Sequence, residues 1–319
     1  MKPKEILVFG ATGQIGRYLL RKLAKNNFRV TAVTRNIHRK GYILKSQANA
    51  GWLNINEITT LNYEKLKKLF QNKDICINLI GILTEKDKNS FYNIHTLLPK
   101  KLAELSKENN LEQFIHLSAL GIEEAVDSKY ASTKLSGENE IKKIFENYLI
   151  LRPSLVYSVD DNFTTMLFNL LKYIPIFPLY YRGKTAFFPI HASDMAEVIE
   201  SVILRQIKSK TIECIGPEKI TFKEIIKKLL NSLNTNRFLL PTPLFIAKII
   251  AKFFENTMSK PLLTTDQLIL LNYDNAPNGK YSTNIQLNLN DNLKFFDKEI
   301  IKYSYMWKVG GEFSKKKES

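Results

Sequence analysis

Glu5-Ile-Leu-Val-Phe-Gly-Ala-Thr-Gly-Gln-Ile-Gly-Arg17 is the stretch that decides the fold of this chain. Residues 6–9 are all apolar and predict a buried parallel strand, and apolar residues resume at helical spacing over 18–23. Glycines separate the two segments. A strand, a glycine turn and a helix in this order aim backbone N–H groups at a pyrophosphate, with the positive end of the helix dipole behind them. The stretch therefore predicts a dinucleotide-binding unit.

The glycines of this turn follow the spacing G-x-x-G-x-x-G, not the more common G-x-G-x-x-G. We expect Gly10 to form the tight turn, Gly13 to let the backbone approach the phosphates, and Gly16 to let the helix pack close to the strand. A glycine turn without a ligand is the weaker alternative, because a strand and a helix flank this one. The expected cofactor contacts here are Gly10, Thr12, Gly13, Gln14, Ile15, Gly16 and Arg17.

The chain of 319 residues is long enough for one large or two modest domains, and it carries a net charge of +16. Such an excess is typical of proteins that meet nucleic acid, anionic membranes or acidic ligands. Lys, Asn and Ile are frequent throughout the chain, which indicates a biased genome, and the lysines are scattered over many helices. No stripe of interleaved basic and aromatic residues occurs, so we expect no nucleic-acid partner.

The two cysteines, Cys76 and Cys214, lie in apolar strand-like runs and are expected to be reduced core residues, not a disulfide. Four scattered histidines show no metal-ligand spacing, so no metal is expected. The first strand begins close to Met1 and no apolar run reaches the ~20 residues that span a bilayer. We therefore expect a bacterial-type cytoplasmic protein, or one held peripherally on the cytoplasmic face of the inner membrane.

The end of the second predicted strand, residues 28–35, bears on the choice of cofactor. An acid there would bind the adenosine ribose 2′-hydroxyl, but the residue is Arg35, followed by basic residues at 38–40 and with Arg17 nearby. A guanidinium can grip a 2′-phosphate with two hydrogen bonds. We expect NADP(H) in preference to NAD(H). A solvated basic loop that binds either form is the alternative.

Strands and helices of crossover length alternate along the chain, which predicts an α/β fold with a Rossmann-type doubly wound parallel sheet. Leu79 and Gly81 end one strand and are expected beside the cofactor. Residues 1–158 form the predicted Rossmann domain. Residues 159–310 are predicted to form a smaller, mainly helical lobe, of which the segment 185–215 returns to the sheet. Residues 311–319 are expected to be a flexible tail. The further strands are expected near 52–55, 74–81, 113–118, 148–152 and 211–215, and helices over 61–70, 93–107 and 194–204, the last capped by Ser193 or Asp194.

Farther along the chain, three residues have side chains of the types needed for proton transfer. Ser118 ends a strand, and Tyr130 and Lys134 lie four residues apart on the next helix, hence on one face of it. A nearby ammonium lowers the pKa of a phenol and can bind a nicotinamide ribose, while a serine hydroxyl can polarise a carbonyl. Such pairs also occur by chance on helices. The order glycine turn, serine-ended strand and Y-x-x-x-K favours a catalytic-type site.

At these motifs the chain resembles the short-chain dehydrogenase/reductase superfamily, and within it the atypical branch of the complex I alpha-subcomplex subunit nine type. The resemblance implies tight NADPH binding, with the backbone of Pro153 and Leu155 beside the nicotinamide ring. It also implies a structural role in complex I. Ser158 replaces a glycine usual in the branch, and Phe188 a polar residue. The matching stretches are residues 77–81, 114–121, 130–138, 151–154, 161–163, 183–185, 189, 194, 239–244 and 261–267.

Two functions therefore stay open at this stage. The first is an NADP(H)-binding accessory or assembly protein of respiratory complex I, with complex I subunits as partners. The second is an active NADPH-dependent reductase or epimerase, acting on a carbonyl or nucleotide-sugar compound through Tyr130, Lys134 and Ser118. A redox sensor that responds to the coenzyme ratio is a third, without a distinguishing residue.

Two features of the predicted C-terminal lobe each have more than one interpretation. Residues 243–254 are predicted to form an apolar helix that carries Lys248 and Lys252 one turn apart. It could lie on an anionic membrane or dock into a partner, or it could be buried in the lobe with its lysines extended outward. Five aromatic residues could line a pocket or fill a core: Phe168, Tyr173, Phe177, Tyr180 and Tyr181.

Overall fold

The computed structural model describes residues 3–48, 51–59, 63–86, 89–259, 261–308 and 310–311, without the side chains of Arg39 and Lys40. Apart from Gly311, the tail expected to be flexible lies outside these residues. The chain divides into two compact units. Unit 1 comprises 1–153, 192–214 and 278–291, and unit 2 comprises 154–191, 215–277 and 292–319.

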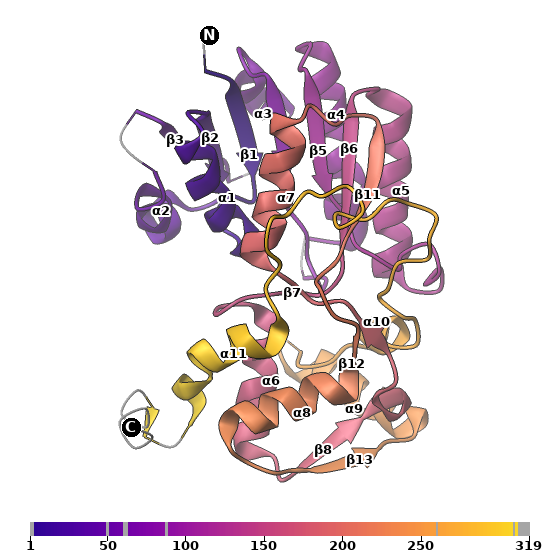
Figure 1. Cartoon of the computed structure of the whole chain (residues 1–319). Helices are drawn as coiled ribbons and strands as arrows, with labels where there is room; N and C mark the ends of the chain where they lie inside the picture. Colours follow the sequence, from indigo (N-terminus) through magenta and orange to yellow (C-terminus); the bar gives the residue numbers. More distant parts are fainter. Residues whose placement is uncertain are drawn as a thin grey trace. The chain divides into compact units, whose positions relative to one another are not determined.

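Unit 1 is built on a seven-stranded sheet in which all neighbouring strands are parallel, in the order β11-β6-β5-β4-β1-β2-β3. This confirms the predicted doubly wound, Rossmann-type α/β fold (Figure 1). The strands are β1 (Glu5–Phe9), β2 (Arg29–Thr34), β3 (Leu53–Glu57), β4 (Ile75–Asn78), β5 (Gln113–Leu117), β6 (Tyr148–Pro153) and β11 (Lys210–Cys214).

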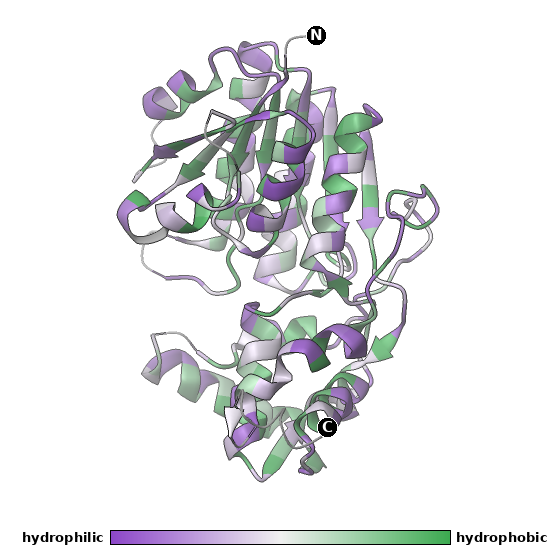
Figure 2. Ribbon diagram, turned by 60° about the vertical axis from the view of Figure 1, so that its left-hand side comes forward, coloured by the Kyte–Doolittle hydropathy of each residue, from purple (hydrophilic) through white to green (hydrophobic). Residues whose placement is uncertain are grey.

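Helices cover both faces of this sheet, because its apolar strands have no polar face to leave in water. On one face α1 packs against α7, and on the other α3, α4 and α5 enclose a core that includes Leu7, Phe70 and Phe114. Figure 2 shows the hydrophobic strands between helices of mixed hydropathy. The helices are α1 (Gln14–Lys25), α2 (Ile37–Lys45), α3 (Tyr63–Phe70), η1 (Tyr92–Leu97), α4 (Leu98–Glu108), α5 (Lys129–Ile144) and α7 (Ala192–Leu204).

Local details of unit 1 differ from prediction in two places. The segment expected as one helix over 93–107 begins as the π-helix η1 and continues as α4. Helix α7 begins at Ala192, directly after a strand, so that Ser193 and Asp194 lie inside the helix and are not its caps. The cysteines are core residues, as predicted: Cys76 and Cys214 are buried and free, and burial raises the pKa of both thiols.

Unit 2 is mainly helical, as predicted, with three small two-stranded sheets that pair β7 with β10, β8 with β13 and β9 with β12. Its core joins α6, α8 and α11. The elements are β7 (Val156–Tyr157), α6 (Asn162–Tyr173), β8 (Ile176–Leu179), η2 (Tyr180–Gly183), β9 (Ala186–Phe187), β10 (Ile190–His191), β12 (Ile220–Thr221), α8 (Phe222–Leu233), β13 (Phe238–Pro241), α9 (Leu244–Thr257), α10 (Thr265–Leu270), α11 (Phe296–Ser304) and η3 (Tyr305–Trp307).

The aromatic residues of unit 2 fill cores more than they line a pocket. Phe168 and Phe177 belong to the main core, and Tyr180 lies in a smaller cluster against which Tyr181 packs. Tyr173 belongs to neither cluster and is exposed. The open choice between pocket and core is thus resolved toward the core for four of these five residues.

The unit boundaries differ from the expected domains at several positions. Residues 278–291 belong to unit 1, although the sequence places them in the lobe. They lie alongside β11, where the N–H of Glu213 donates to the Ser282 carbonyl and the N–H of Asn284 to the Glu213 carbonyl. The segment lacks the alternation typical of a strand, so nothing in the sequence indicates this pairing. Of the segment 185–215, which was predicted to return to the sheet, residues 192–214 lie in unit 1. The first stretch of unit 1 ends at Pro153, whereas the sequence predicted residue 158.

The lysine-bearing helix of the sequence is α9, and of the alternatives left open for it, burial within the lobe does not apply. It buries only Ala247 and Ala251, against Tyr180 and Leu268. Within the described part of the chain, no helix combines the length and apolarity required to cross a membrane.

Candidate functional site

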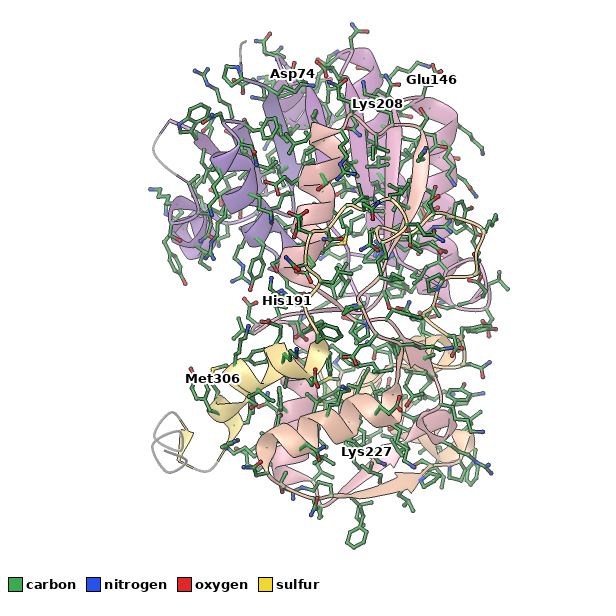
Figure 3. All side chains as sticks on the ribbon, in the orientation of Figure 1. Asp74, Glu146, His191, Lys208, Lys227 and Met306 are labelled. Atoms are coloured by element: carbon green, nitrogen blue, oxygen red, sulfur yellow. The ribbon has the colours of Figure 1, made fainter. Side chains whose placement is uncertain are left out.

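The glycine turn lies at the carboxyl end of the parallel sheet. Asp74, Glu146 and Lys208 precede β4, β6 and β11, and Figure 3 shows all three together at one end of unit 1. The strands therefore run from that end toward the one where β1 stops at Phe9 and Gly10 follows. In doubly wound sheets the crevice at the carboxyl ends of the strands is where ligands bind.

Backbone contacts require the glycines of this turn. Gly10 has a φ of +80°, and a Cβ on it would lie 3.0 Å from the carbonyl carbon of Leu79, the residue that follows β4. A Cβ on Gly16 would lie 2.5 Å from the carbonyl oxygen of Ala11. The turn is closed by the N–H of Gly13, which donates to the Gly10 carbonyl at 2.9 Å. Strand and helix thus approach more closely than any side chain would allow.

The first turn of α1 is suited to an anion. Its N-cap residue, Gly13, supplies no side-chain hydrogen bond, and the first turn holds no acidic residue. The first N–H groups of a helix have no partner within it, and they add to the positive end of the dipole. The buried amide Nε2 of Gln14 has no hydrogen-bond partner among the described residues. Thr12 is half-buried and Ile15 is buried. Backbone and side chains here fit a diphosphate.

Further polar atoms are gathered at the ends of β4 and β5. The side-chain amide of Asn78 lies 3.1 Å from Nδ1 of His116, and its Oδ1 accepts a hydrogen bond from the N–H of Ile80. Nε2 of His116 and Oγ of Ser118 are buried and have no hydrogen-bond partner within the described part of the chain. Leu79 continues the strand ladder, since its N–H donates to the Phe9 carbonyl. Buried polar atoms are normally paired, so these orphaned atoms are consistent with a polar ligand such as a dinucleotide.

Lys134 reaches this end of the sheet from α5. Its Nζ donates to the Leu117 carbonyl at 3.0 Å, and the residue is 3% exposed. Burial lowers the pKa of Lys134 to about 8, so the ammonium is still charged at pH 7. The same Nζ lies 5.9 Å from the centre of the Tyr130 ring and 3.4 Å from where a Cβ on Gly81 would be. The tyrosine, the lysine and Gly81, separated in sequence, are therefore brought together.

His95 is a site residue that the sequence analysis missed. Its ring packs edge-on against Tyr130 with 5.1 Å between ring centres, and its Nε2 accepts a hydrogen bond from the N–H of Ile82. Burial and the charge of Lys134 lower the pKa of His95 to about 3, which keeps the imidazole neutral. It is carried by the π-helix η1, a feature often found at functional sites. A single histidine on an apolar helix gives no sequence signal for such a role.

Because two histidines are buried, we expect the free energy of unfolding to fall in acid. Burial lowers the pKa of His116 well below its usual value, as does the charge of Lys134. An unfolded chain binds the proton near pH ~6.5, so the free energy of unfolding falls as pH drops below that value. Replacing His116 by Gln should reduce this slope by about 1.4 kcal/mol per pH unit between pH ~6 and ~4.5, in urea unfolding at several pH values. The exposed His38 is the matched control, and a His116→Gln slope equal to that of the wild type would contradict the prediction.

Of the residues expected near the adenosine ribose, Arg35 lies at the end of β2 and Arg17 lies on α1. Arg35 follows this strand directly and is exposed, and Nε of Arg17 lies 3.3 Å from the Gly13 carbonyl oxygen. An unforeseen acid, Glu57, ends the neighbouring strand β3, but its carboxylate accepts a hydrogen bond from the N–H of Ile37 at the start of α2. The basic residues expected to assist include Arg39 and Lys40, whose side chains lie outside the described part.

The remaining predicted contacts are divided between the units. Pro153 ends β6 in unit 1, and its carbonyl accepts from the N–H of Leu120. Leu155 belongs to unit 2, where its carbonyl accepts from Ile190. Ser158 is fully buried, and its N–H donates to Asp161 Oδ2. The serine that departs from the expected glycine is therefore accommodated without a left-handed backbone.

Comparison with known proteins places this geometry in a family. The profile of the NAD dependent epimerase/dehydratase family matches residues 6–212, about two thirds of the chain. The chain belongs to that family. The matched residues run from β1 into β11 and so include the glycine turn and the Tyr130–Lys134 pair.

Curated relatives of this family member include two complex I subunits that resemble it over more residues than the profile matches, and a reductase that resembles it over fewer. Subunit 9 of the NADH dehydrogenase [ubiquinone] 1 alpha subcomplex, mitochondrial, from Mus musculus is 27% identical over 263 residues, 82% of this chain and 70% of the relative. The NADH-ubiquinone oxidoreductase 40 kDa subunit of Neurospora crassa is 25% identical over 262 residues, 82% of this chain and 68% of the relative. A ceramide reductase of Caulobacter vibrioides is 26% identical over 193 residues, 60% of this chain and 58% of the relative.

Solved structures share the fold at low sequence identity. Triphenylmethane reductase from Citrobacter sp., complexed with NADP(H), has a TM-score of 0.71 at 16% identity, over 94% of this chain and 99% of that one. The dTDP-glucose 4,6-dehydratase DesIV from Streptomyces venezuelae, with NAD and TYD bound, has a TM-score of 0.68 at 15% identity, over 95% and 96%. These structures therefore show that the chain shares its fold with the two proteins.

Proposed function

We propose that this member of the NAD dependent epimerase/dehydratase family is an NADP(H)-binding accessory or assembly protein of respiratory complex I. The observation that carries the proposal is the extent of its likeness to the mouse subunit. The 263 aligned residues exceed the family-matched segment 6–212, so they include part of the chain beyond the segment that the family profile matches. A match to the family profile alone would not require this sequence similarity. Complex I subunits are accordingly its proposed partners, on the cytoplasmic face of the inner membrane.

Isolation from membranes tests this role. The tagged full chain, recovered from mildly solubilised membranes of its source organism, should migrate with complex I or an assembly intermediate on a native gel. Mass analysis of the same band should find complex I subunits. Recovery of the chain alone in the soluble fraction, with normal complex I in a deletion strain, would overturn the proposal.

The preference for NADP(H) rests on Arg35 at the end of β2. A charge-assisted hydrogen bond is worth roughly 1.5–3 kcal/mol, so Arg35→Gln should weaken NADPH binding by about 10- to 100-fold and leave NADH binding nearly unchanged. Titration calorimetry with both coenzymes measures this. Arg29, at the opposite end of the same strand, is exposed, forms an ion pair with Glu5 among the described residues, and is the matched Arg→Gln control. Equal wild-type affinity for both coenzymes would contradict the preference.

The alternative, an active NADPH-dependent reductase or epimerase, is favoured by the buried Lys134 beside Tyr130 and by the likeness to a ceramide reductase. In that role Tyr130 is the proton donor, Lys134 tunes its pKa and binds the nicotinamide ribose, and Ser118 donates to the substrate oxygen.

Replacing Tyr130 by Phe separates the two functions. General acid–base groups contribute about 10²- to 10⁴-fold, so an enzyme should lose at least about 100-fold in turnover of carbonyl or nucleotide-sugar substrates. Coenzyme affinity should change less than about threefold, because the ring remains. An unchanged rate would refute the tyrosine mechanism, whereas a wild type without turnover on any such substrate would favour the accessory role.

A further inference from the structure

Helix α9 is oriented with its large apolar residues in solvent. Phe245, Ile249 and Phe253 are 66%, 65% and 62% exposed, and they follow one another at helical spacing on one face. The opposite face holds the two buried alanines. We call these three residues the α9 stripe. Most amphipathic helices of a globular unit bury such a stripe, so its exposure marks an interaction surface.

Exposed apolar residues continue into the strand that precedes this helix. Phe238 and Leu240 of β13 are 80% and 56% exposed, and they share one face of the strand because they lie two residues apart. Leu239 between them packs against the core of unit 2. Strand and helix are consecutive along the chain (Figure 1), so two neighbouring elements of unit 2 both present apolar side chains to solvent.

The charges beside the α9 stripe determine what it fits. Lys248 and Lys252 lie one turn apart along one edge of the stripe, and both are exposed. Neither takes part in an ion pair among the described residues. The one acid of α9, Glu255, is engaged by the backbone N–H and hydroxyl of Thr265. The cores of protein–protein interfaces are depleted in lysine, whereas helices that lie on membranes combine an apolar face with lysines at its edge.

We propose that the α9 stripe with Lys248 and Lys252 docks this chain on an anionic lipid bilayer. The helix has 14 residues, too few to span a bilayer, so it lies in the interface with the stripe among the acyl chains and the ammonium groups at the phosphates. A second copy of the chain fits less well, because a twofold contact would bring like charges together without an acid to pair them. The inference goes beyond the proposed function, since it needs neither coenzyme nor complex I.

Binding to vesicles tests the proposal directly. The full chain is incubated with vesicles of phosphatidylcholine alone or of phosphatidylcholine with phosphatidylglycerol, and bound protein is separated by flotation. We expect binding to the anionic vesicles only, weakened by salt. Phe245→Gln/Ile249→Gln/Phe253→Gln should abolish it while coenzyme binding by unit 1 is retained. Lys248→Gln/Lys252→Gln should weaken it about 30-fold, from about 1 kcal/mol per lysine.

The matched control is Lys223→Gln/Lys227→Gln on α8, two exposed lysines with the same spacing and the same change in net charge; Figure 3 labels Lys227. It should bind within about threefold of the wild type, and an equal loss in both double variants would overturn the proposal, because net charge alone would then explain binding. So would failure of the wild type to bind anionic vesicles. A wild-type dimer that the triple variant converts to a monomer would identify a second copy as the occupant instead. Loss of complex I subunits from the triple variant, without vesicle binding by the wild type, would identify a protein partner.

Discussion

Replacing Gly16 by Ala is expected to weaken dinucleotide binding at least about 100-fold, since each 1.4 kcal/mol lost is a factor of ten. The new Cβ would lie 2.5 Å from the carbonyl oxygen of Ala11 and 2.6 Å from that of Gly10, and backbone atoms cannot move aside as a flexible side chain can. Strand β1 and helix α1 must therefore separate, which displaces the N–H groups that face the diphosphate. Titration calorimetry with NADPH measures the loss.

Two further variants keep this prediction falsifiable. Lys25→Ala, on the exposed last turn of the same helix, should bind as the wild type does. Gly13→Ala tests the phosphate contact without forcing the strand and helix apart, because its Cβ would meet only the Gly10 carbonyl, at 3.1 Å. It should fold normally and bind about tenfold more weakly. Normal NADPH affinity in both glycine variants would show that the turn does not hold the coenzyme.

Arg152→Met is expected to lower the free energy of unfolding by about 3–5 kcal/mol, because it removes the hydrogen-bonded counter-ion of a buried carboxylate, Glu138, whose other cationic partner is Lys142 at 3.7 Å. Arg152 is 2% exposed on β6, and its Nε and Nη2 donate to the two oxygens of the fully buried Glu138 at 2.8 and 2.6 Å. Its Nη2 also donates to Glu123 at 2.9 Å. Denaturant unfolding monitored by circular dichroism should show an earlier transition.

The same network attaches residues 278–291 to unit 1. Burial alone would raise the pKa of Glu123, but hydrogen bonds from Lys280, Tyr281 and Arg152 hold it at about 2. Limited proteolysis of Arg152→Met should therefore cut this segment faster than in the wild type. Lys143→Met, which removes an exposed ion pair with Glu140 on α5, is the control and should change stability by less than about 0.5 kcal/mol. Equal stability of both variants would contradict the role of the network.

Local patterns made much of unit 1 predictable. The signals for β1, the glycine turn and α1 are consecutive in the sequence. Each of them determines the conformation of its own segment of backbone. The pairing of Tyr130 with Lys134 likewise follows from one helical turn. Contacts between distant segments were not predictable: nothing near His95 indicates that a π-helix will bring it against Tyr130, and nothing near Tyr281 indicates Arg152 beneath its ring.

The orientation of α9 could not be predicted from the sequence for a related reason. Apolar residues occupy most of the helix circumference, so the pattern does not reveal which side faces the core. The decision depends on what is available to pack against it, here Tyr180 and Leu268, which accept only the two alanines. Similarly, residues 278–291 pair with the sheet through backbone hydrogen bonds, and their sequence has no hydrophobic periodicity that would predict this pairing.

The central claim is that the peptide N–H groups of the turn from Gly10 to Gly16 hold the diphosphate of a nicotinamide coenzyme. Titration calorimetry of the full wild-type chain with NADPH, repeated with Gly16→Ala, tests it most directly. We predict one molecule of NADPH bound per chain by the wild type and none by the variant at the same concentrations. Failure of the folded wild type to bind either NADPH or NADH at millimolar concentration would contradict the claim.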